Sequence, residues 1–130
     1  MAHPNEDLVR KGYAAFSSGD METLSSLYAP DAIHVATGNS QLAGEYKGVD
    51  AILAYYGRLF ELSDGTFAVE LENVEVDGDD TVRATHRDKG QRGDKTLDQP
   101  EVLTFTIADG KITRLVEDHS DQATYDAFWS

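Results

Sequence analysis

The side chains best suited to chemistry in this sequence are its histidines. There are four, and because His3 is terminal, His34, His86 and His119 remain as the interior candidates. A neutral imidazole can take or give a proton near pH 7, and a nearby carboxylate fixes its tautomer and raises its basicity. We therefore expect His34 or His86 to act as an acid or base.

Two carboxylates are the expected orienting partners. Val82, Ala84, His86 and Asp88 alternate along one predicted strand and share a face, which the two apolar residues mark as buried. Glu117 is the second candidate partner. His86 should therefore point into the molecule, with Asp88 nearer the mouth of any pocket.

The direction of His119 is left open by the alternation alone. His119 shares a strand face with Leu115 and Glu117, whereas the opposite face carries Ile112 and Val116. Both faces contain apolar residues, so periodicity cannot choose between them.

Each histidine also has a simpler interpretation, as an interior or rim residue bonded to a backbone carbonyl or a tyrosine. A metal site is not expected, because the histidines have no local ligand spacing and no i, i+4 pair. The chain has no cysteine, nucleophile elbow, phosphate loop or dinucleotide fingerprint. No cofactor is therefore expected.

Apolar spacing predicts helices in the first half of the chain. Asn5 is the expected N-cap of a helix to about Ser17, and Asp20 caps a second helix that includes Tyr28 and stops before Pro30. The strongest helical stripe lies in 49–62, and Asp121 caps a short last helix. The apolar residues of the 49–62 stripe are Ile52, Tyr55, Tyr56, Leu59 and Phe60.

The second half alternates at period two, which indicates strands. A short strand over 31–35 precedes a loop over 37–48 that contains a brief extended piece around Leu42 to Tyr46, and the third helix follows. A phase slip at Glu72-Asn73 predicts a bulge. Lys89 to Lys95 is expected to be a solvated loop. The predicted meander has strands at about 66–76, 80–88, 96–107 and 111–119. Three helices on one strongly curved, mostly antiparallel sheet define an α+β fold with a cavity on the concave face.

Length, charge and composition limit the classes of function that are expected. At 130 residues the chain has the length of a single domain, 1–130, with no apolar run long enough for a membrane span. A net charge of −13 argues against binding nucleic acid or an anionic membrane. The first residues lack a signal-peptide pattern, so a cytoplasmic location is expected.

The order of these motifs resembles a known family. Ser18-Gly19-Asp20, the run from Leu27 to Ala32, Leu42-Ala43-Gly44, Asp109 to Ile112, and Asp126 to Trp129 together cover nearly the whole chain. They resemble the SnoaL-like branch of the superfamily that also contains ketosteroid isomerase and nuclear transport factor 2. The resemblance implies a cone-shaped, cystatin-like α+β barrel with a deep apolar pocket, a homodimer, and His119 and Glu117 facing inward.

The resemblance does not extend to ketosteroid isomerase chemistry. Its general-base aspartate would fall on Ala36, its oxyanion-hole tyrosine near Gly12, and its protonated aspartate on Val102 or Leu103. Without a base and strong donors at these points, steroid isomerisation is not expected. The supporting tyrosines of that site match Tyr28 and Tyr56.

The expected function is that of a pocket protein for a small, apolar, oxygenated molecule. As an enzyme it would perform cofactor-free proton transfer, such as isomerisation, cyclisation, dehydration or epoxide opening; the alternative is a non-catalytic ligand-binding or dimerisation module of the same fold. The predicted catalytic residues are His34, His86, Asp88, Glu117 and His119. The predicted ligand-binding residues are Tyr13, Phe16, Tyr28, Tyr55, Tyr56, Phe60, Leu103, Phe105 and Trp129.

Overall fold

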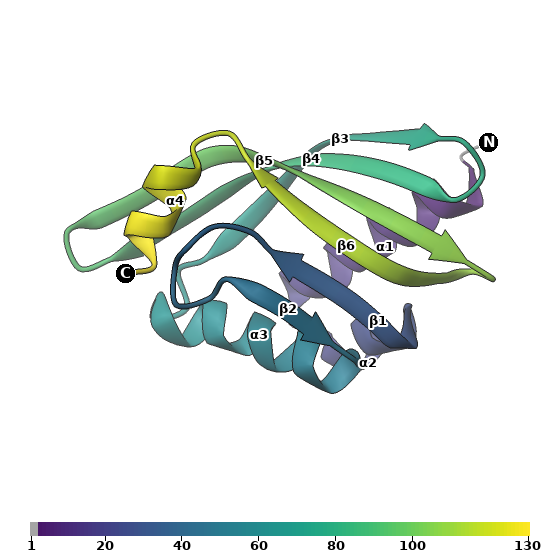
Figure 1. Cartoon of the computed structure of the whole chain (residues 1–130), viewed down its shortest axis with the longest axis horizontal. Coiled ribbons are helices and arrows are strands. Elements are labelled where there is room, and N and C mark those ends of the chain that lie inside the picture. The colour runs from purple at the N-terminus through teal and green to yellow at the C-terminus, as the bar shows by residue number, and fades with distance from the viewer. Residues whose placement is uncertain (1–2) are drawn as a thin grey trace.

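A computed structural model describes residues 3–130 and shows one curved sheet folded over helices (Figure 1). The six strands lie in the order β2-β1-β6-β5-β4-β3, and β1 and β6 pair in parallel while the other neighbours are antiparallel. The helices are α1 (Pro4–Ser18), α2 (Met21–Ser26), α3 (Val49–Leu62) and α4 (Gln122–Phe128). The strands are β1 (Tyr28–Ala36), β2 (Gly44–Lys47), β3 (Ala68–Asp77), β4 (Thr81–Arg92), β5 (Lys95–Ala108) and β6 (Lys111–His119).

Helix α1 begins earlier than its sequence predicts. His3 is the N-cap, and its Nδ1 atom accepts a hydrogen bond from the backbone N–H of Asn5 at 3.1 Å. The prediction of Asn5 as the cap is wrong because Pro4, which has no N–H and a fixed φ, is suited to the first helical position. The helix ends at Gly19, which has a φ of 75°.

The boundary between α2 and β1 also differs from the prediction. Asp20 caps α2 as expected, accepting from the N–H of Thr23 at 3.1 Å, but the helix ends at Ser26. Tyr28 already belongs to β1 because it pairs with Ile112 of β6. The long-range strand pairing therefore outweighs the helical spacing that placed Tyr28 on the second helix.

The hairpin between β4 and β5 is longer than predicted. The expected loop from Lys89 to Lys95 is wrong, because the ladder continues to the pair Arg92 and Lys95. Arg92 donates to the carbonyl oxygens of Leu62 and Phe128, at 2.9 and 2.6 Å, so its charge ties the hairpin to α3 and α4 instead of facing solvent.

The predicted bulge in β3 is confirmed. The register of β3 against β4 shifts between Leu71 and Asn73, which includes the phase slip read from the sequence. On either side of the shift, the residues of β3 pair one to one with residues of β4.

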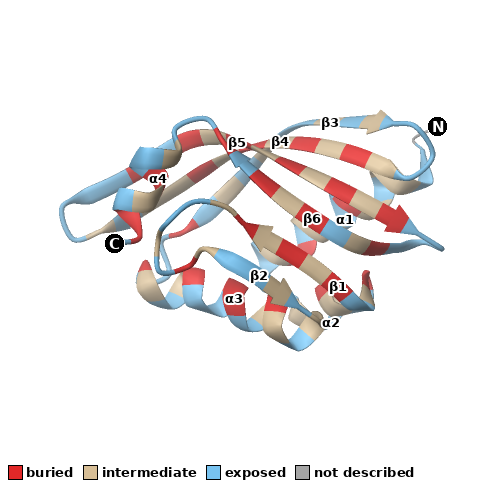
Figure 2. Cartoon of the chain, viewed as in Figure 1, coloured by how far each residue is buried: buried red, intermediate tan, exposed pale blue. Residues whose placement is uncertain are grey.

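The core lies between the concave face of the sheet and helices α1 and α3. Buried and half-exposed residues alternate along β4, β5 and β6, as Figure 2 shows. The curved, mostly antiparallel sheet, the three N-terminal helices and the short α4 confirm the predicted α+β class. None of the helices within residues 3–130 is long and apolar enough to cross a membrane.

Candidate active site

A narrow cavity of about 70 Å³ lies between the concave face of the sheet and the helices. At about 10 to 15 Å³ per water molecule, it has room for only a few of them. Its walls combine aromatic rings with buried ionisable side chains, which is the composition of a specific ligand site. The predicted ligand-binding residues that line it are Tyr13, Phe16, Tyr28, Tyr55, Tyr56, Leu103 and Phe105.

A wider hollow of about 370 Å³ adjoins this cavity. Phe16, Phe67 and Val69 line both spaces, so the two are neighbours at the end of α1 and the start of β3. Phe60, also predicted to bind ligand, lines the outer hollow. An elongated molecule could therefore place its apolar part outside and a polar end inside.

Glu117 on β6 is the centre of one buried network. Its Oε2 atom lies 2.7 Å from Nε2 of His34 and accepts the hydroxyl of Tyr55 at 2.6 Å. Nδ1 of His34 lies 2.9 Å from the hydroxyl of Tyr56, which lies 2.8 Å from that of Tyr28. We call these five residues the Glu117 network.

The direction of the hydrogen bonds in the Glu117 network follows from the chemistry of its members. An ionised carboxylate can only accept, so Nε2 of neutral His34 carries the proton that is shared with Glu117. Nδ1 of His34 then accepts from Tyr56, and Tyr28 donates to the oxygen of Tyr56. The result is a continuous proton path from the cavity wall to a buried carboxylate.

Asp88 and His86 form a second buried cluster on β4. Nε2 of His86 lies 2.9 Å from Oδ1 of Asp88, and its Nδ1 lies 2.6 Å from the hydroxyl of Tyr13. Asp88 is fully buried and His86 is 3% exposed. Both side chains line the cavity, as the alternation of β4 predicts.

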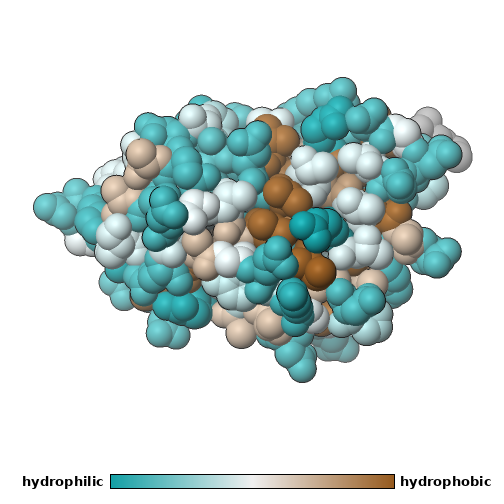
Figure 3. Space-filling model, in the orientation of Figure 1, coloured by the Kyte–Doolittle hydropathy of each residue, from teal (hydrophilic) through white to brown (hydrophobic). Residues whose placement is uncertain are grey.

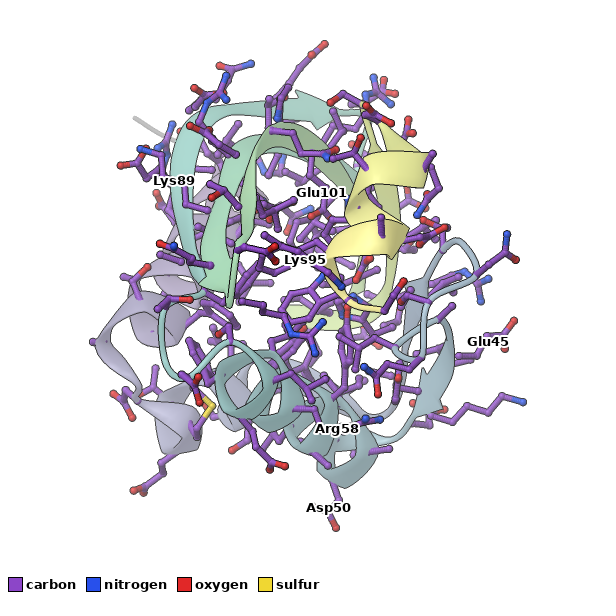
Figure 4. All side chains as sticks on the ribbon, turned by 90° about the vertical axis from the view of Figure 1, so that its left-hand side faces the viewer. Glu45, Asp50, Arg58, Lys89, Lys95 and Glu101 are labelled. Atoms are coloured by element: carbon purple, nitrogen blue, oxygen red, sulfur yellow. The ribbon has the colours of Figure 1, made fainter. Side chains whose placement is uncertain are left out.

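Glu101 on β5 completes this cluster and was missed from the sequence. The strand registers place Glu101 opposite His86 of β4 and opposite His119 of β6, so three neighbouring strands bring the residues into one row. Oε1 of Glu101 lies 3.2 Å from Nε2 of His86 and 3.5 Å from Nδ1 of His119. Figure 4 shows Glu101 enclosed by the barrel, whereas Glu45 and Asp50 project outward.

His119 links the two clusters. Its Nε2 lies 2.8 Å from Oε1 of Glu117, and its side chain is fully buried against Tyr125, with ring centroids 3.5 Å apart. The structure therefore places His119 on the inner side of β6, but behind the cavity wall, where it contacts the ligand site through Glu117.

The buried environment shifts the pKa values of Glu117 and His119 in opposite directions. Burial opposes the charge on Glu117, but hydrogen bonds from His119 and His34 outweigh it and lower the pKa of Glu117 to about 2. Burial likewise opposes the charge on His119, yet the carboxylates of Asp88 and Glu117 raise the pKa of His119 to about 10. In the absence of other cations, Glu117 and His119 form a charged pair at neutral pH.

Glu101 and Asp88 are shifted in opposite directions. Burial, together with the charges of Glu117 and Asp88, raises the pKa of Glu101 well above its usual range. Burial opposes the charge of Asp88, but His119 and His86 hold the pKa of Asp88 below its usual range. Two close carboxyl groups in one dry site thus favour one proton between them.

One predicted ligand-binding residue lies away from both spaces. Trp129 lines neither the cavity nor the hollow; it is fully buried beside Phe67 and Phe128, with centroid distances of 5.6 and 4.8 Å. Its place after α4 makes it part of the core that closes one end of the barrel.

Comparisons with known proteins agree with this architecture. The uncharacterized protein Rv0034 of Mycobacterium tuberculosis (strain ATCC 25618 / H37Rv) is 41% identical over 124 residues, which is 95% of each chain. Bal32a from a soil-derived mobile gene cassette is 38% identical, with a TM-score of 0.95 over 98% of this chain and 97% of that one. A putative polyketide cyclase from Sinorhizobium meliloti is 28% identical, with a TM-score of 0.72 over 86% and 94% of the two chains.

The curved sheet and the order of the elements define a small α+β barrel. A sequence profile of the SnoaL-like domain matches residues 9–115. The chain belongs to the SnoaL-like family, as its motifs predict.

Proposed function

We propose that the protein is an acid/base enzyme that acts on a small, largely apolar molecule with a carbonyl or similar oxygen. The observation that carries the proposal is the proton path from Tyr28 and Tyr56 through His34 to Glu117, all of which line the cavity. The relation to a putative polyketide cyclase supports cyclase- or isomerase-type chemistry.

In the proposed step, a carbon next to the carbonyl loses a proton. The phenol oxygen of Tyr56 takes this proton while its own proton moves to Nδ1 of His34, 2.9 Å away. The C–H electron pair stays on the substrate as an enolate, and Glu117 stabilises the imidazolium of His34. Return of the proton to another atom completes an isomerisation, and attack of the enolate on a second carbonyl completes a cyclisation.

The hollow and the cavity set the shape of the substrate. The outer hollow takes an apolar ring or chain between Phe16 and Phe67, and the inner cavity admits only the reacting end. Burial of the tyrosine hydroxyls keeps water away from the enolate, which strengthens each hydrogen bond to it.

The proposal is tested by exchange of α-hydrogens for deuterium in cyclohexanone, 2-tetralone and 4-phenyl-2-butanone, measured by NMR in D₂O. The wild-type chain should accelerate exchange of at least one ketone, and His34→Gln should reduce the rate by about 10²- to 10⁴-fold, the usual contribution of a general base. His3→Gln is the matched control, because His3 is exposed at the start of α1 and should retain the rate.

Two results would contradict the enzyme proposal. One is exchange no faster than in buffer for all three ketones, and the other is an unchanged rate in His34→Gln. Saturable binding of a ketone without exchange would instead support the ligand-binding module.

A further inference from the structure

We propose that His86, Asp88, Glu101 and His119 form a binding site for one divalent transition-metal cation, with Zn²⁺ as the best-matched ion. We call these four residues the quartet. The inference goes beyond the proposed function, which depends on His34 and Tyr56.

The first support is the geometry of the donor atoms. Nε2 of His86 lies 2.9 Å from Oδ1 of Asp88 and 3.2 Å from Oε1 of Glu101. Nδ1 of His119 lies 3.5 Å from the same oxygen of Glu101 and 3.7 Å from Oδ2 of Asp88. A tetrahedral zinc site with metal–ligand bonds of about 2.0 to 2.2 Å needs neighbouring donors about 3.3 to 3.5 Å apart. The structure holds donors within 4.8 Å of one another in two triads that share Glu101, namely His86, Asp88 and Glu101, and Glu101, Glu117 and His119.

The second support is a pair of unsatisfied atoms. Among residues 3–130, Oδ2 of Asp88 and Nδ1 of His119 are buried without a hydrogen-bond partner, although they face each other across the quartet. Buried polar atoms left without a partner are costly and are usually matched by a proton, water or ion. A cation between them would satisfy both atoms.

The third support is the set of contacts behind the ligands. The second nitrogen of His119 contacts Oε1 of Glu117 at 2.8 Å, and the second nitrogen of His86 contacts the hydroxyl of Tyr13 at 2.6 Å. Metal-binding histidines commonly donate their free N–H to a carboxylate or another oxygen, which fixes the ring and raises its basicity. Both histidines of the quartet already have such a partner.

The donor set selects the class of ion. Two imidazoles and two carboxylates suit zinc and neighbouring transition metals better than calcium or magnesium, which prefer oxygen ligands alone. The quartet side chains are almost fully buried, so a bound ion would be held away from bulk water. Because His86, Asp88 and Glu101 line the cavity, the ion would face a bound substrate.

The experiment measures binding of Zn²⁺ to the full chain after dialysis against a chelator, by isothermal titration calorimetry. Co²⁺ serves as a spectroscopic probe, because tetrahedral nitrogen and oxygen ligation produces intense visible absorption. We expect one equivalent of Zn²⁺, a raised Tm, and tetrahedral Co²⁺ bands.

Variants test whether Zn²⁺ binds at the quartet or at other acidic groups. Glu101→Gln keeps the side-chain shape and should weaken Zn²⁺ binding by more than 100-fold, as should His119→Gln. Glu117→Gln leaves the quartet in place but removes the charged support of His119, and it should weaken binding by about 10- to 100-fold. His3→Gln is the control: it removes an exposed histidine outside the cavity and the quartet, and it should bind Zn²⁺ as tightly as wild type.

The result that overturns the inference is a folded wild-type chain, verified by circular dichroism, that binds no Zn²⁺ at neutral pH. Binding that Glu101→Gln and His119→Gln both retain would place the ion elsewhere and overturn it as well. Neither result concerns His34-dependent deuterium exchange, so failure of the metal site and failure of the enzyme proposal are distinguishable.

Discussion

Oε2 of Glu117 lies 2.7 Å from Nε2 of His34, so a residue near the end of the last strand holds an imidazole from the first. The two strands are parallel neighbours in the sheet, and their register pairs His34 with Leu115, two residues before Glu117. The contact therefore depends on the crossover that brings β1 beside β6.

Glu117→Gln should destabilise the fold by about 3 kcal/mol, because it leaves the buried His119 imidazolium without its nearest counter-charge. Urea unfolding measures the loss. Asp118→Asn changes the exposed neighbour on the same strand and should stay within about 0.5 kcal/mol of wild type. Equal stability of the two variants would mean that the Glu117 pair makes no net contribution.

The buried tyrosines predict a sharp loss of stability in alkali. Burial raises the pKa of Tyr28 from 10.0 to about 12, so the folded chain keeps a proton that the unfolded chain loses above pH 10. This contribution is complete below pH 10 and is lost as pH rises through about 12. Burial shifts the pKa values of other tyrosines in the same direction, namely Tyr13, Tyr55, Tyr56 and Tyr125.

Ultraviolet absorption and circular dichroism should therefore report tyrosine ionisation and unfolding as one transition. Tyr46→Phe is the control, since Tyr46 is less enclosed and its removal should leave that transition in place. Gradual ionisation near pH 10 with the fold intact would refute the buried hydroxyl network.

Local sequence signals determined most of the fold. The apolar stripe from Ile52 to Phe60 predicts α3, and alternation predicts the meander, because both patterns act over a few residues. The parallel pairing of β1 with β6 depends on residues about eighty positions apart, so no local pattern indicates it. For the same reason, the sequence could name His34 and Glu117 as candidates but could not predict that they touch.

Glu101 is a residue whose type favours the surface but whose position in the strand is buried. Leu103, Phe105 and Ile107 alternate on the buried face of β5, and continuing that period backwards reaches Glu101. The signal was present, but an acidic residue beside a charged hairpin is more often solvated. Trp129 is the reverse case: an aromatic side chain that the sequence favours for the pocket is fully buried in the core and lines neither space.

Trp129→Ala should lower the free energy of unfolding by about 3 to 5 kcal/mol, because the side chain is fully buried at the closed end of the barrel. Trp129→Phe should cost less, about 1.5 kcal/mol, because the indole N–H has no hydrogen-bond partner among residues 3–130. Urea unfolding followed by circular dichroism compares the two. A larger loss for Phe than for Ala would mean that the indole shape itself is required.

The outer face of the sheet leads to a prediction about assembly. Ile33, Val35 and Val116 alternate with inward residues and are only half-buried, and Figure 3 shows apolar side chains gathered at the centre of this face. Arg114 and Asp118 lie on either side of Val116 on the same strand face and are exposed. We propose that this face forms a homodimer, in which a two-fold axis at Val116 would place each Arg114 against Asp118 of the second copy.

Val116→Glu should therefore convert the dimer to a monomer and raise its dissociation constant at least 100-fold, because it buries two unpaired like charges at the axis. Sedimentation velocity measures the change, with Ala68→Glu on the exposed part of β3 as the matched control. Arg114→Asp alone should also weaken the dimer, and adding Asp118→Arg should restore it by reversing the pair. A wild-type chain that stays monomeric at high micromolar concentration, or a double variant no tighter than Arg114→Asp, would exclude this two-fold arrangement.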